Sequence, residues 1–291
     1  MADRGLGRGT ASPATSDERI VVRKLRRPGR WITGALIVVF LALFARSVVV
    51  NPGFQWDVVA RYFTAPTILK GLTLTLTLTV IAMSLGILLG IVLAVMRLSE
   101  NPLARWASTA VITVVRGTPL LVQLFLCYNI AALYPTLSIA IPFGPQLFEA
   151  DMNAVVTPIA AAVLALSLNE GAYMAEIIRA GLQSIDKGQI EAAKAVGLSP
   201  GKTFRRIVMP QVMTLVIPPT GNQLIGMLKM TSIVSIIGLS DLLYSAQTIY
   251  LRTYEVIPLL LVASIWYFIV TSILSLIQTQ IERKFGKGVS A

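Results

Sequence analysis

Long apolar runs without charge alternate with short charged segments along the whole 291-residue chain. A helix needs about 20 apolar residues to cross the hydrocarbon core of a bilayer. Six runs approach that length, and each predicts a transmembrane helix: Trp31 to Val50, Gly71 to Met96, Gly117 to about Tyr134, Met152 to about Arg179, Gln211 to about Leu228, and Val256 to about Gln278. The pattern therefore predicts an all-α integral membrane protein with six spans.

Two of these runs contain signals that oppose a simple helix. Leu and Thr alternate over residues 72–79, which on a soluble chain is typical of a half-buried strand. That stretch opens a 26-residue uncharged run, however, and Thr can bond back to the preceding helical turn, so we predict a helix. Pro218-Pro219 interrupts the fifth run, where we predict a broken helix whose freed carbonyls face a binding site.

Composition agrees with a membrane protein and excludes several functions. Hydrophobic residues make up 55% of the chain, charged residues 13%, and the mean hydropathy is +0.74. The net charge of +11 does not indicate nucleic-acid binding, because the Lys and Arg residues lie between apolar runs. The chain has no His and only Cys127, which removes the usual general base and leaves no Cys pair for a disulfide or metal. We therefore predict no catalytic residue, no metal site and no cofactor bound by this chain.

The distribution of positive charge predicts the orientation. Residues 1–30 carry eight Lys or Arg, residues 97–116 three, residues 179–211 six and residues 279–291 three, which together are 20 of the 25 in the chain. Cytoplasmic loops are enriched in these residues, so both termini and the 179–211 loop are predicted to face the cytoplasm. Residues 1–30 are predicted to be a basic, partly disordered tail. A cleaved signal peptide at residues 31–45 is the alternative to a retained first span, and the long basic region before it favours the span.

The 179–211 loop contains signals for two short helices. Asp186 can cap the first helix, with Gln189 as a capping-box partner. Gly197 supplies a left-handed stop, and Ser199-Pro200 supply the cap and first residue of a second helix. We expect Pro210 to end that second helix at the membrane boundary. The segment 197–203 is not a Walker A loop, because only three residues separate its glycines and a helix precedes it.

The same loop resembles the EAA motif of ABC importer permeases. Glu191-Ala192-Ala193 is followed at the motif's spacing by Gly197, Ile207 and Met209-Pro210, with Met209 in the place usually held by Leu. In that family the loop is the coupling helix and lies in a groove of the ATPase subunit. The resemblance implies that coupling involves Glu191, Ala192, Ala193, Gly197, Ile207 and Pro210.

Further segments resemble the subfamily that imports polar amino acids such as His, Glu, Gln, Arg and opines. They are residues 116–123, residues 172–181, Pro218-Pro219 with Asn222-Gln223, and Leu228-Lys229 with Thr231-Ser232. The resemblance covers residues 66–280 and implies a five-helix permease core, with a coupling loop at 184–210 and a cytoplasmic tail at 281–291. Residues 31–50 are then an extra transmembrane helix. Met230 departs from the acidic or amide residue common in the family, which leaves the amino-acid type open.

The resemblance implies the permease subunit of an ATP-driven importer in the bacterial cytoplasmic (inner) membrane. Its expected partners are two ATPase subunits that use the ATP, a second identical or homologous permease, an extracytoplasmic solute-binding protein and membrane lipid, with no nucleic acid. An ABC importer of a non-amino-acid solute and an ion-coupled secondary transporter are the alternatives.

Polar side chains within the predicted spans are candidates for the substrate pathway. A charge at the centre of a helix costs about 2.5 to 3.5 kcal/mol on insertion scales, so such groups tend to face an interior path. The candidates are Asn169, Glu170, Tyr173, Asn222, Gln223 and Lys229. Hydrogen bonding between neighbouring helices is the alternative role for the amides, and snorkelling to the interface is the alternative for Lys229. Glu176 is predicted to pair locally with Arg179.

Overall fold

The computed structural model describes residues 28–140 and 146–286 and separates the chain into two units, residues 1–52 and 53–291. The first unit contains helix α1 (Pro28–Val50), whose described side chains are almost all exposed. Its bounds agree with the predicted first span within three residues. The predicted disorder of the N-terminal tail and the last residues of the predicted C-terminal tail lie outside the described residues.

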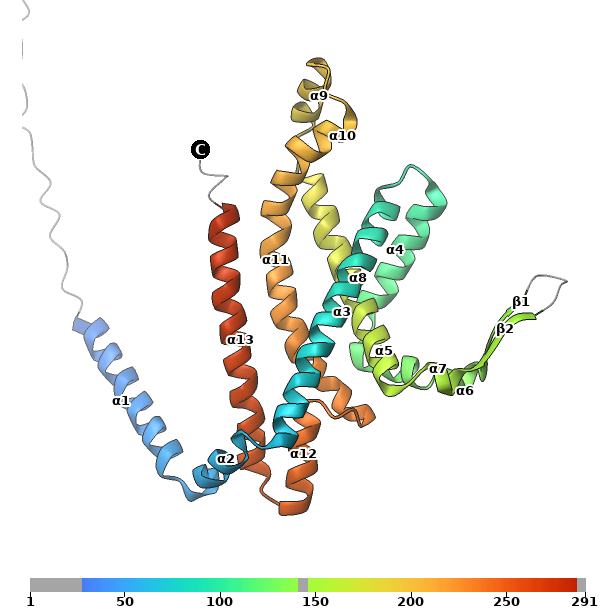
Figure 1. The fold of residues 1–291 in the computed structure, drawn as a ribbon. Helices are drawn as coiled ribbons and strands as arrows, with labels where there is room; N and C mark the ends of the chain where they lie inside the picture. Colours follow the sequence, from blue (N-terminus) through green and yellow to red (C-terminus); the bar gives the residue numbers. More distant parts are fainter. Residues whose placement is uncertain (1–27, 141–145, 287–291) are drawn as a thin grey trace, which may run out of the picture. The chain divides into compact units, whose positions relative to one another are not determined.

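The second unit is built from helices and one hairpin (Figure 1). Its helices are α2 (Trp56–Phe63), α3 (Pro66–Leu98), α4 (Pro102–Gly117), α5 (Leu120–Tyr128), α6 (Ile130–Leu133), α7 (Met152–Val155), α8 (Pro158–Gln183), α9 (Lys187–Ala195), α10 (Pro200–Thr203), α11 (Met209–Met230), α12 (Leu242–Thr253) and α13 (Val256–Gly286). Strands β1 (Thr136–Ala140) and β2 (Gln146–Asp151) pair antiparallel. Two 3-10 segments, Pro52–Phe54 and Thr231–Ile237, and one π-helical segment, Phe204–Val208, complete the described elements.

Proline and short polar side chains explain where the long helices begin. Pro lacks an N–H and has a helical φ, so it suits the first turn, where α3, α4 and α8 each carry one. Asn101 accepts hydrogen bonds from the backbone N–H groups of Leu103 and Ala104, and Thr157 accepts one from Ala160. The starts of α4 and α8 are therefore set by these capping residues and prolines, and not by where an apolar run begins.

The Leu-Thr alternation forms a helix, as predicted. Thr73, Thr77 and Thr79 each donate a side-chain hydrogen bond to the carbonyl four residues earlier, at 2.7–2.9 Å. The hydroxyls are therefore satisfied within α3, which permits polar side chains on a helix in lipid.

Four described helices are long and apolar enough to cross a membrane: α1 from Ile32, α3, α8 and α13 to Lys284. The number rises to six if two bent pairs each count as one span. One pair is α4 with α5, at 106°, and the other joins the continuous helix Pro200–Ile237 to α12, at 45°. The mostly helical architecture is thus confirmed.

The predicted third span, Gly117 to about Tyr134, is wrong. That segment contains the end of α4, the sharply bent α5 and the short α6. Residues 97–116, which we expected to form a charged loop, are mostly the helix α4, and only residues 99–101 separate it from α3. The error arose because an uncharged run was taken to begin after Arg116, whereas the helix itself begins at Pro102.

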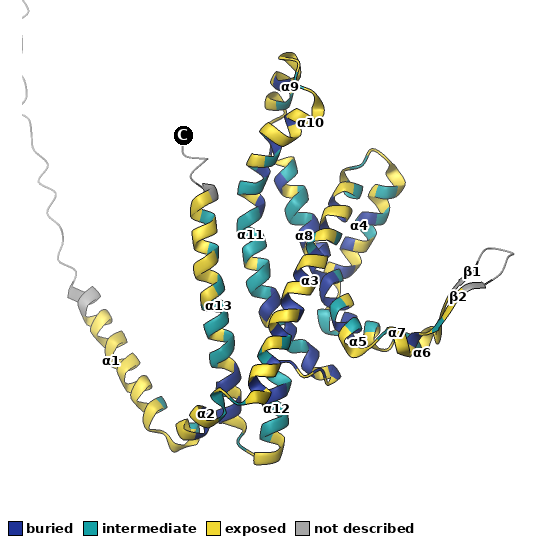
Figure 2. Ribbon diagram, in the orientation of Figure 1, coloured by how far each residue is buried: buried dark blue, intermediate teal, exposed yellow. Residues whose placement is uncertain are grey.

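Helix α3 lies at the centre of the core (Figure 2). One buried cluster joins α3 to α5, α8 and the segment around Val234, and a second joins the start of α3 to α2, α12 and α13. Between α3 and α8 the packing is close enough that a Cβ added to Gly90 would lie 2.5 Å from the Cβ of Met174. Small residues at such positions let helix backbones approach closely.

Candidate functional site

The first helix of the coupling loop has the ends that the sequence predicts. The Asp186 side chain caps α9 by accepting a hydrogen bond from the N–H of Gly188 at 2.6 Å. Gly197 ends it with φ +75°, and the N–H of Leu198 donates to the carbonyl of Ala193 at 3.0 Å. The predicted capping box is wrong, since the Gln189 side chain accepts a hydrogen bond from Gln211 instead.

The second helix does not end at Pro210 as expected. Helix α10 continues through the π-helical segment Phe204–Val208 into α11, and Pro210 lies in the first turn of α11. The N–H of Met209 donates to the carbonyl of Phe204, five residues back. This wider turn accommodates a proline that has no N–H to donate, so the coupling loop is joined to a long membrane helix without a flexible break.

The predicted coupling residues differ in exposure. Glu191, Ala192, Gly197 and Pro210 are exposed, Ile207 is half-buried, and Ala193 is buried with 3% of its surface exposed. Val196, next to the left-handed glycine, is 76% exposed. Helix α9 and the turn after it therefore expose small and apolar side chains next to charged ones such as Glu191 and Lys194, between the end of α8 and the start of α11 (Figure 1).

Two hydrogen-bonded pairs of polar side chains lie within the helices. Asn169 on α8 donates to the side-chain oxygen of Gln123 on α5 at 3.2 Å. Gln223 on α11 donates to the carboxylate of Glu170 on α8, at 3.4 and 3.5 Å. Adjacent residues of α8 thus connect to helices on two sides, and three of the predicted pathway residues come together.

Glu170 is fully buried, with 0% of its surface exposed. Its methylene groups contact α3, where a Cβ added to Gly86 would lie 2.7 Å from its Cβ and Cγ. The carboxylate is directed to the amide of Gln223, and no ion pair to it is found in the part of the chain that the structure describes. This acidic group therefore lies where three helices meet.

The other predicted pathway residues lie apart from that junction. Asn222 is exposed and accepts a hydrogen bond from Gln278 of α13 at 3.1 Å. Lys229 is exposed in the last turn of α11. Tyr173 is 37% exposed, and the guanidinium carbon of Arg116 lies 5.2 Å from the centre of its ring.

Three polar residues near the site were not among the sequence-based candidates. They are Arg116 and Gln123, on either side of the α4–α5 bend, and Gln278 on α13. Arg116 and Gln123 are the ends of a motif segment that the sequence does contain. Gln278 was missed because it lies at the end of the predicted sixth span. A polar side chain at the membrane–water interface needs no functional explanation.

The predicted break at Pro218-Pro219 is wrong. Helix α11 continues through both prolines, and the bend of 45° comes later, between Ile237 and Leu242. Prolines are tolerated in transmembrane helices because neighbouring groups satisfy the freed backbone. The Gln278 side chain donates to the carbonyl of Pro218 at 3.3 Å and so connects α13 to α11 beside the prolines.

An ion-pair cluster lies near the end of α8 that leads to the coupling loop. Glu176 accepts hydrogen bonds from Arg179 at 2.7 and 3.1 Å, as predicted, and also pairs with Arg97 at the end of α3. The local pairing was readable from the spacing of three residues. The contact with Arg97 depends on how α3 and α8 pack.

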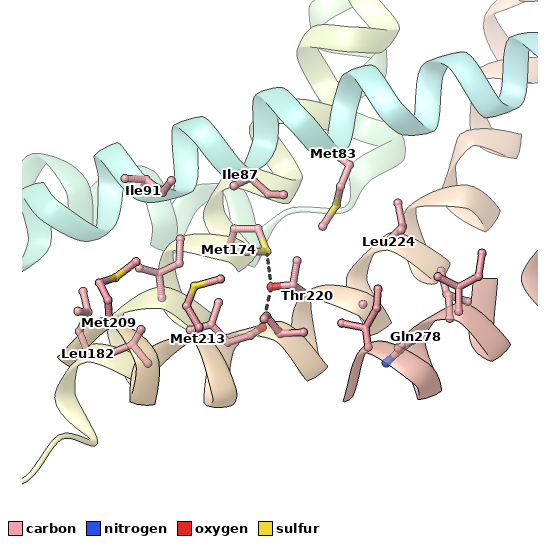
Figure 3. Close-up of a pocket in the computed structure, with 18 of the residues that line it drawn as sticks. Met83, Ile87, Ile91, Met174, Leu182, Met209, Met213, Thr220, Leu224 and Gln278 are labelled. Carbon is pink, nitrogen blue, oxygen red and sulfur yellow. Dashed lines mark hydrogen bonds between the residues drawn. The ribbon is translucent and has the colours of Figure 1, made fainter. Parts of the chain in front are cut away.

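An apolar groove of about 650 Å³ opens beside the polar junction, between α3, α8, α11 and α13 (Figure 3). Met83, Ile87, Met174 and Leu224 are among its lining side chains. Thr220 is one of its few polar groups, and its hydroxyl bonds to the carbonyl of Val216 at 2.7 Å, within its own helix. The groove is therefore a hydrophobic surface that runs along the polar site.

Comparison with known proteins agrees with this geometry. A family model described as "Binding-protein-dependent transport system inner membrane component" matches residues 86–287. The arginine transport system permease protein ArgU of Corynebacterium glutamicum is 40% identical over 288 residues, covering 98% of this chain and 88% of that protein. The arginine transport system permease protein ArtQ of Bacillus subtilis is 38% identical, covering 75% of this chain and 92% of that protein.

A solved structure is also similar. The crystal structure of an amino acid ABC transporter with histidines contains a chain that is 37% identical, with a TM-score of 0.63, covering 75% of this chain and 94% of that one. An inward-facing MetNI methionine ABC transporter chain, 17% identical with a TM-score of 0.58, shows the shared fold alone.

The chain belongs to the family of inner-membrane components of binding-protein-dependent transport systems. It is a permease subunit of an ABC importer, located in the bacterial inner membrane, and is not itself an enzyme. The ion-coupled secondary transporter is thereby excluded. The family also implies partner subunits of two kinds, an ATPase and a solute-binding protein.

Proposed function

We propose that this permease carries polar amino acids into the cell. The observation that carries the proposal is the polar junction of Asn169, Glu170 and Gln223 within otherwise apolar helices. Relatives of this chain are named for the transport of arginine, cystine and glutamine, which supports an amino-acid substrate over another solute. The buried carboxylate of Glu170 favours a substrate with a positively charged group.

The proposed assembly contains two permease chains, two ATPase subunits that use ATP and one solute-binding protein outside the cytoplasm. The permease core spans residues 66–280, with α1 as an added span at 31–50, giving six spans and both termini in the cytoplasm. The charge distribution of 25 Lys and Arg supports this orientation, since the loop 184–210 carries five of them. Basic tails at 1–30 and 281–291 agree with it.

Transport itself is tested by reconstitution into proteoliposomes with the ATPase and binding-protein subunits. Radiolabelled arginine, glutamine, cystine and a sugar are offered to the binding protein, and uptake is measured with and without ATP inside the vesicles. We expect ATP-dependent uptake of one or more amino acids and none of the sugar. Uptake of the sugar alone would contradict an amino-acid substrate.

Coupling is proposed to pass through Glu191, Ala192, Ala193, Gly197, Ile207 and Pro210, with the ATPase bound to α9 and the turn at Gly197. The exposed left-handed turn supports this role, because a side chain at φ +75° costs about 1–2 kcal/mol and would reshape the surface. The continuous helix from α10 into α11 gives the loop a rigid connection to the membrane.

The matched pair Gly197→Ala and Gly201→Ala tests this proposal. Both glycines are exposed in the same loop and neither has an atom within 4 Å of an added Cβ, but only Gly197 has a positive φ. We expect Gly197→Ala to reduce substrate-stimulated ATPase activity and uptake by about tenfold, since about 1.4 kcal/mol is tenfold in an equilibrium. Gly201→Ala should leave both unchanged, and equal behaviour of the two variants would contradict the proposal.

The substrate pathway is proposed to include Asn169, Glu170, Tyr173, Asn222, Gln223 and Lys229. Glu170→Gln removes the charge while keeping the shape, and Asn222→Ala removes an amide that accepts a hydrogen bond from Gln278. We expect the first to raise the apparent KM for uptake more than the second. An unchanged KM in both variants would remove these residues from the pathway.

A further inference from the structure

Arg116 is an exposed positive charge in the last turn of α4, beside Tyr173 of α8. It lies 14 residues after Pro102 on α4, which is about 21 Å along the axis at 1.5 Å per residue. Its neighbour Tyr173 lies 15 residues after the start of α8 and ten before its end, about 22 and 15 Å. Both helices therefore place the pair well inside a hydrocarbon core of about 30 Å.

The structure gives Arg116 no anionic partner. Among the described residues, no carboxylate lies within ion-pair distance of its guanidinium and no side-chain hydrogen bond to it is found. Its one described contact is with the face of the Tyr173 ring, at 5.2 Å. A charge at this depth is costly unless it faces a polar path or a partner. We therefore expect Arg116 to face the polar path of the transporter.

Capping of α4 does not explain the charge. A basic residue in the last turn of a helix can satisfy its free carbonyls. Here the Thr118 hydroxyl already donates to the carbonyl of Val114 at 2.9 Å, and the Gln123 amide donates to that of Val115 at 2.6 Å. Two of the last four carbonyls of α4 are thus bonded to neutral groups, and Arg116 remains exposed beside them.

The contact with Tyr173 orients the guanidinium without using its donors. A ring face attracts the cation as a whole, so the five N–H groups remain free to donate. A planar guanidinium donates two parallel hydrogen bonds to a carboxylate, which an ammonium group cannot do. Asn169, which donates to Gln123, lies one turn before Tyr173 on α8, so the polar junction continues toward this group.

We propose that Arg116 binds the α-carboxylate of the transported amino acid, with Tyr173 holding the guanidinium in position. This inference rests on the proposed function and adds the group that recognises what all amino acids share. It separates recognition of the carboxylate, at the α4–α5 bend, from recognition of the side chain elsewhere in the pathway.

Direct binding to the purified permease–ATPase complex, without binding protein, tests the assignment. The probes are L-arginine, L-glutamine and their carboxamides, which differ from the acids only in lacking the carboxylate charge. The wild-type complex should bind the acid about 10- to 100-fold more tightly than the amide, as for a hydrogen-bonded charged pair. Arg116→Gln should abolish this preference, and Arg116→Lys should retain part of it.

A matched control separates this role from a structural one. Arg105→Gln removes an exposed charge from the same helix near its start, and it should retain the full preference for the acid. Elution of each variant as a single complex with the ATPase checks that it is folded.

Two results would overturn the assignment: an acid preference in Arg116→Gln equal to that of wild type, or equal binding of acid and amide by the wild-type complex. If the wild-type complex binds neither acid and no amino acid is taken up in reconstitution, the proposed function itself fails, which is a different outcome from a changed ratio.

Discussion

The contact between α3 and α8 and the contact between α11 and α13 are packed in different ways. On the α3 side, glycines meet fixed atoms: a Cβ on Gly90 would lie 2.5 Å from the Cβ of Met174 and 3.0 Å from the backbone nitrogen of Ala175. On the α11–α13 side, Gly221 faces the end of a flexible side chain, with the nearest atom of Gln278 2.7 Å away. A groove of about 650 Å³ extends along this second side.

The difference teaches which contacts can change during transport. Interdigitated backbones resist sliding, because movement in any direction brings fixed atoms into contact. Amide side chains such as Gln278, which bonds to Pro218, Asn222 and Glu282, can exchange partners by rotation. We therefore expect α3 and α8 to move as one body and the α11–α13 contact to adjust, as in the rigid-body motions of other transporters.

The largest effect is expected from a single methyl group at the tight contact. Gly90→Ala should lower the free energy of unfolding by about 2 kcal/mol, because overpacking forces a shift of α3 against α8. Thermal unfolding of the purified protein, followed by intrinsic fluorescence, measures the change. Gly226→Ala on α11 is the control, since nothing lies within 4 Å of its added Cβ and Ala favours a helix. A similar loss in both variants would remove the distinction between the two sides.

The hydroxyl of Thr75 on α3 should also contribute more to the free energy of unfolding than the hydroxyl of Thr220 beside the groove. The Thr75 hydroxyl, fully buried, accepts a hydrogen bond from the backbone N–H of Leu242 at 3.1 Å and so ties α3 to the start of α12. Thr75→Val keeps the shape but leaves a buried N–H without its acceptor, at a cost of about 1–3 kcal/mol. A decrease in the unfolding temperature is expected, and retention of the wild-type value would show that the tie is not needed.

Comparison of sequence and structure shows the same division between local and long-range information. The Thr hydroxyls of α3 and the stop at Gly197 depend on neighbours within five residues, and both were predicted correctly. Two adjacent prolines are a local signal for a break, yet α11 continues through Pro218-Pro219, so the predicted break was wrong. Local signals predict where a helix can start or stop, but tertiary contacts decide whether a weak point becomes a break.

The candidate site divides in the same way. Intramembrane polarity alone identified Asn169, Glu170 and Gln223 as a group to consider, and the structure brings them together with Gln123. Arg116 was assigned to a loop because an uncharged run begins directly after it. Its position beside Tyr173 follows from α4 beginning at Pro102 and the chain bending after Gly117, which no single residue type signals.

A double-mutant cycle measures how adjustable the α11–α13 contact is. Gly221→Ala alone should cost about 1 kcal/mol, because its Cβ would lie within 3.0 Å of Cγ, Cδ and Nε2 of Gln278. Gln278→Ala removes all three of those atoms, so in that background the same change should cost nothing. The expected coupling is therefore at least about 0.5 kcal/mol. Additive effects would mean that Gly221 is constrained by something other than Gln278.

The smallest effect is expected at Thr220, whose hydroxyl faces the groove (Figure 3). It donates to the carbonyl of Val216 at 2.7 Å, and its distance to the sulfur of Met174 is 3.9 Å, a weak contact. Thr220→Val removes a bond that lies within one turn of α11, and it leaves no donor unsatisfied because the hydroxyl that it removes is itself the donor. We expect a change of less than about 0.5 kcal/mol in the free energy of unfolding, within the usual range for substitutions away from tight packing.

The same replacement at Thr75 should lower the free energy of unfolding several times more. The two variants differ only in what the hydroxyl contacts. The ratio of their effects on the free energy of unfolding therefore measures how unequally the α3 side and the groove side are held. Equal effects at Thr75 and Thr220 would show that the groove side is as firmly tied as the side packed on α3.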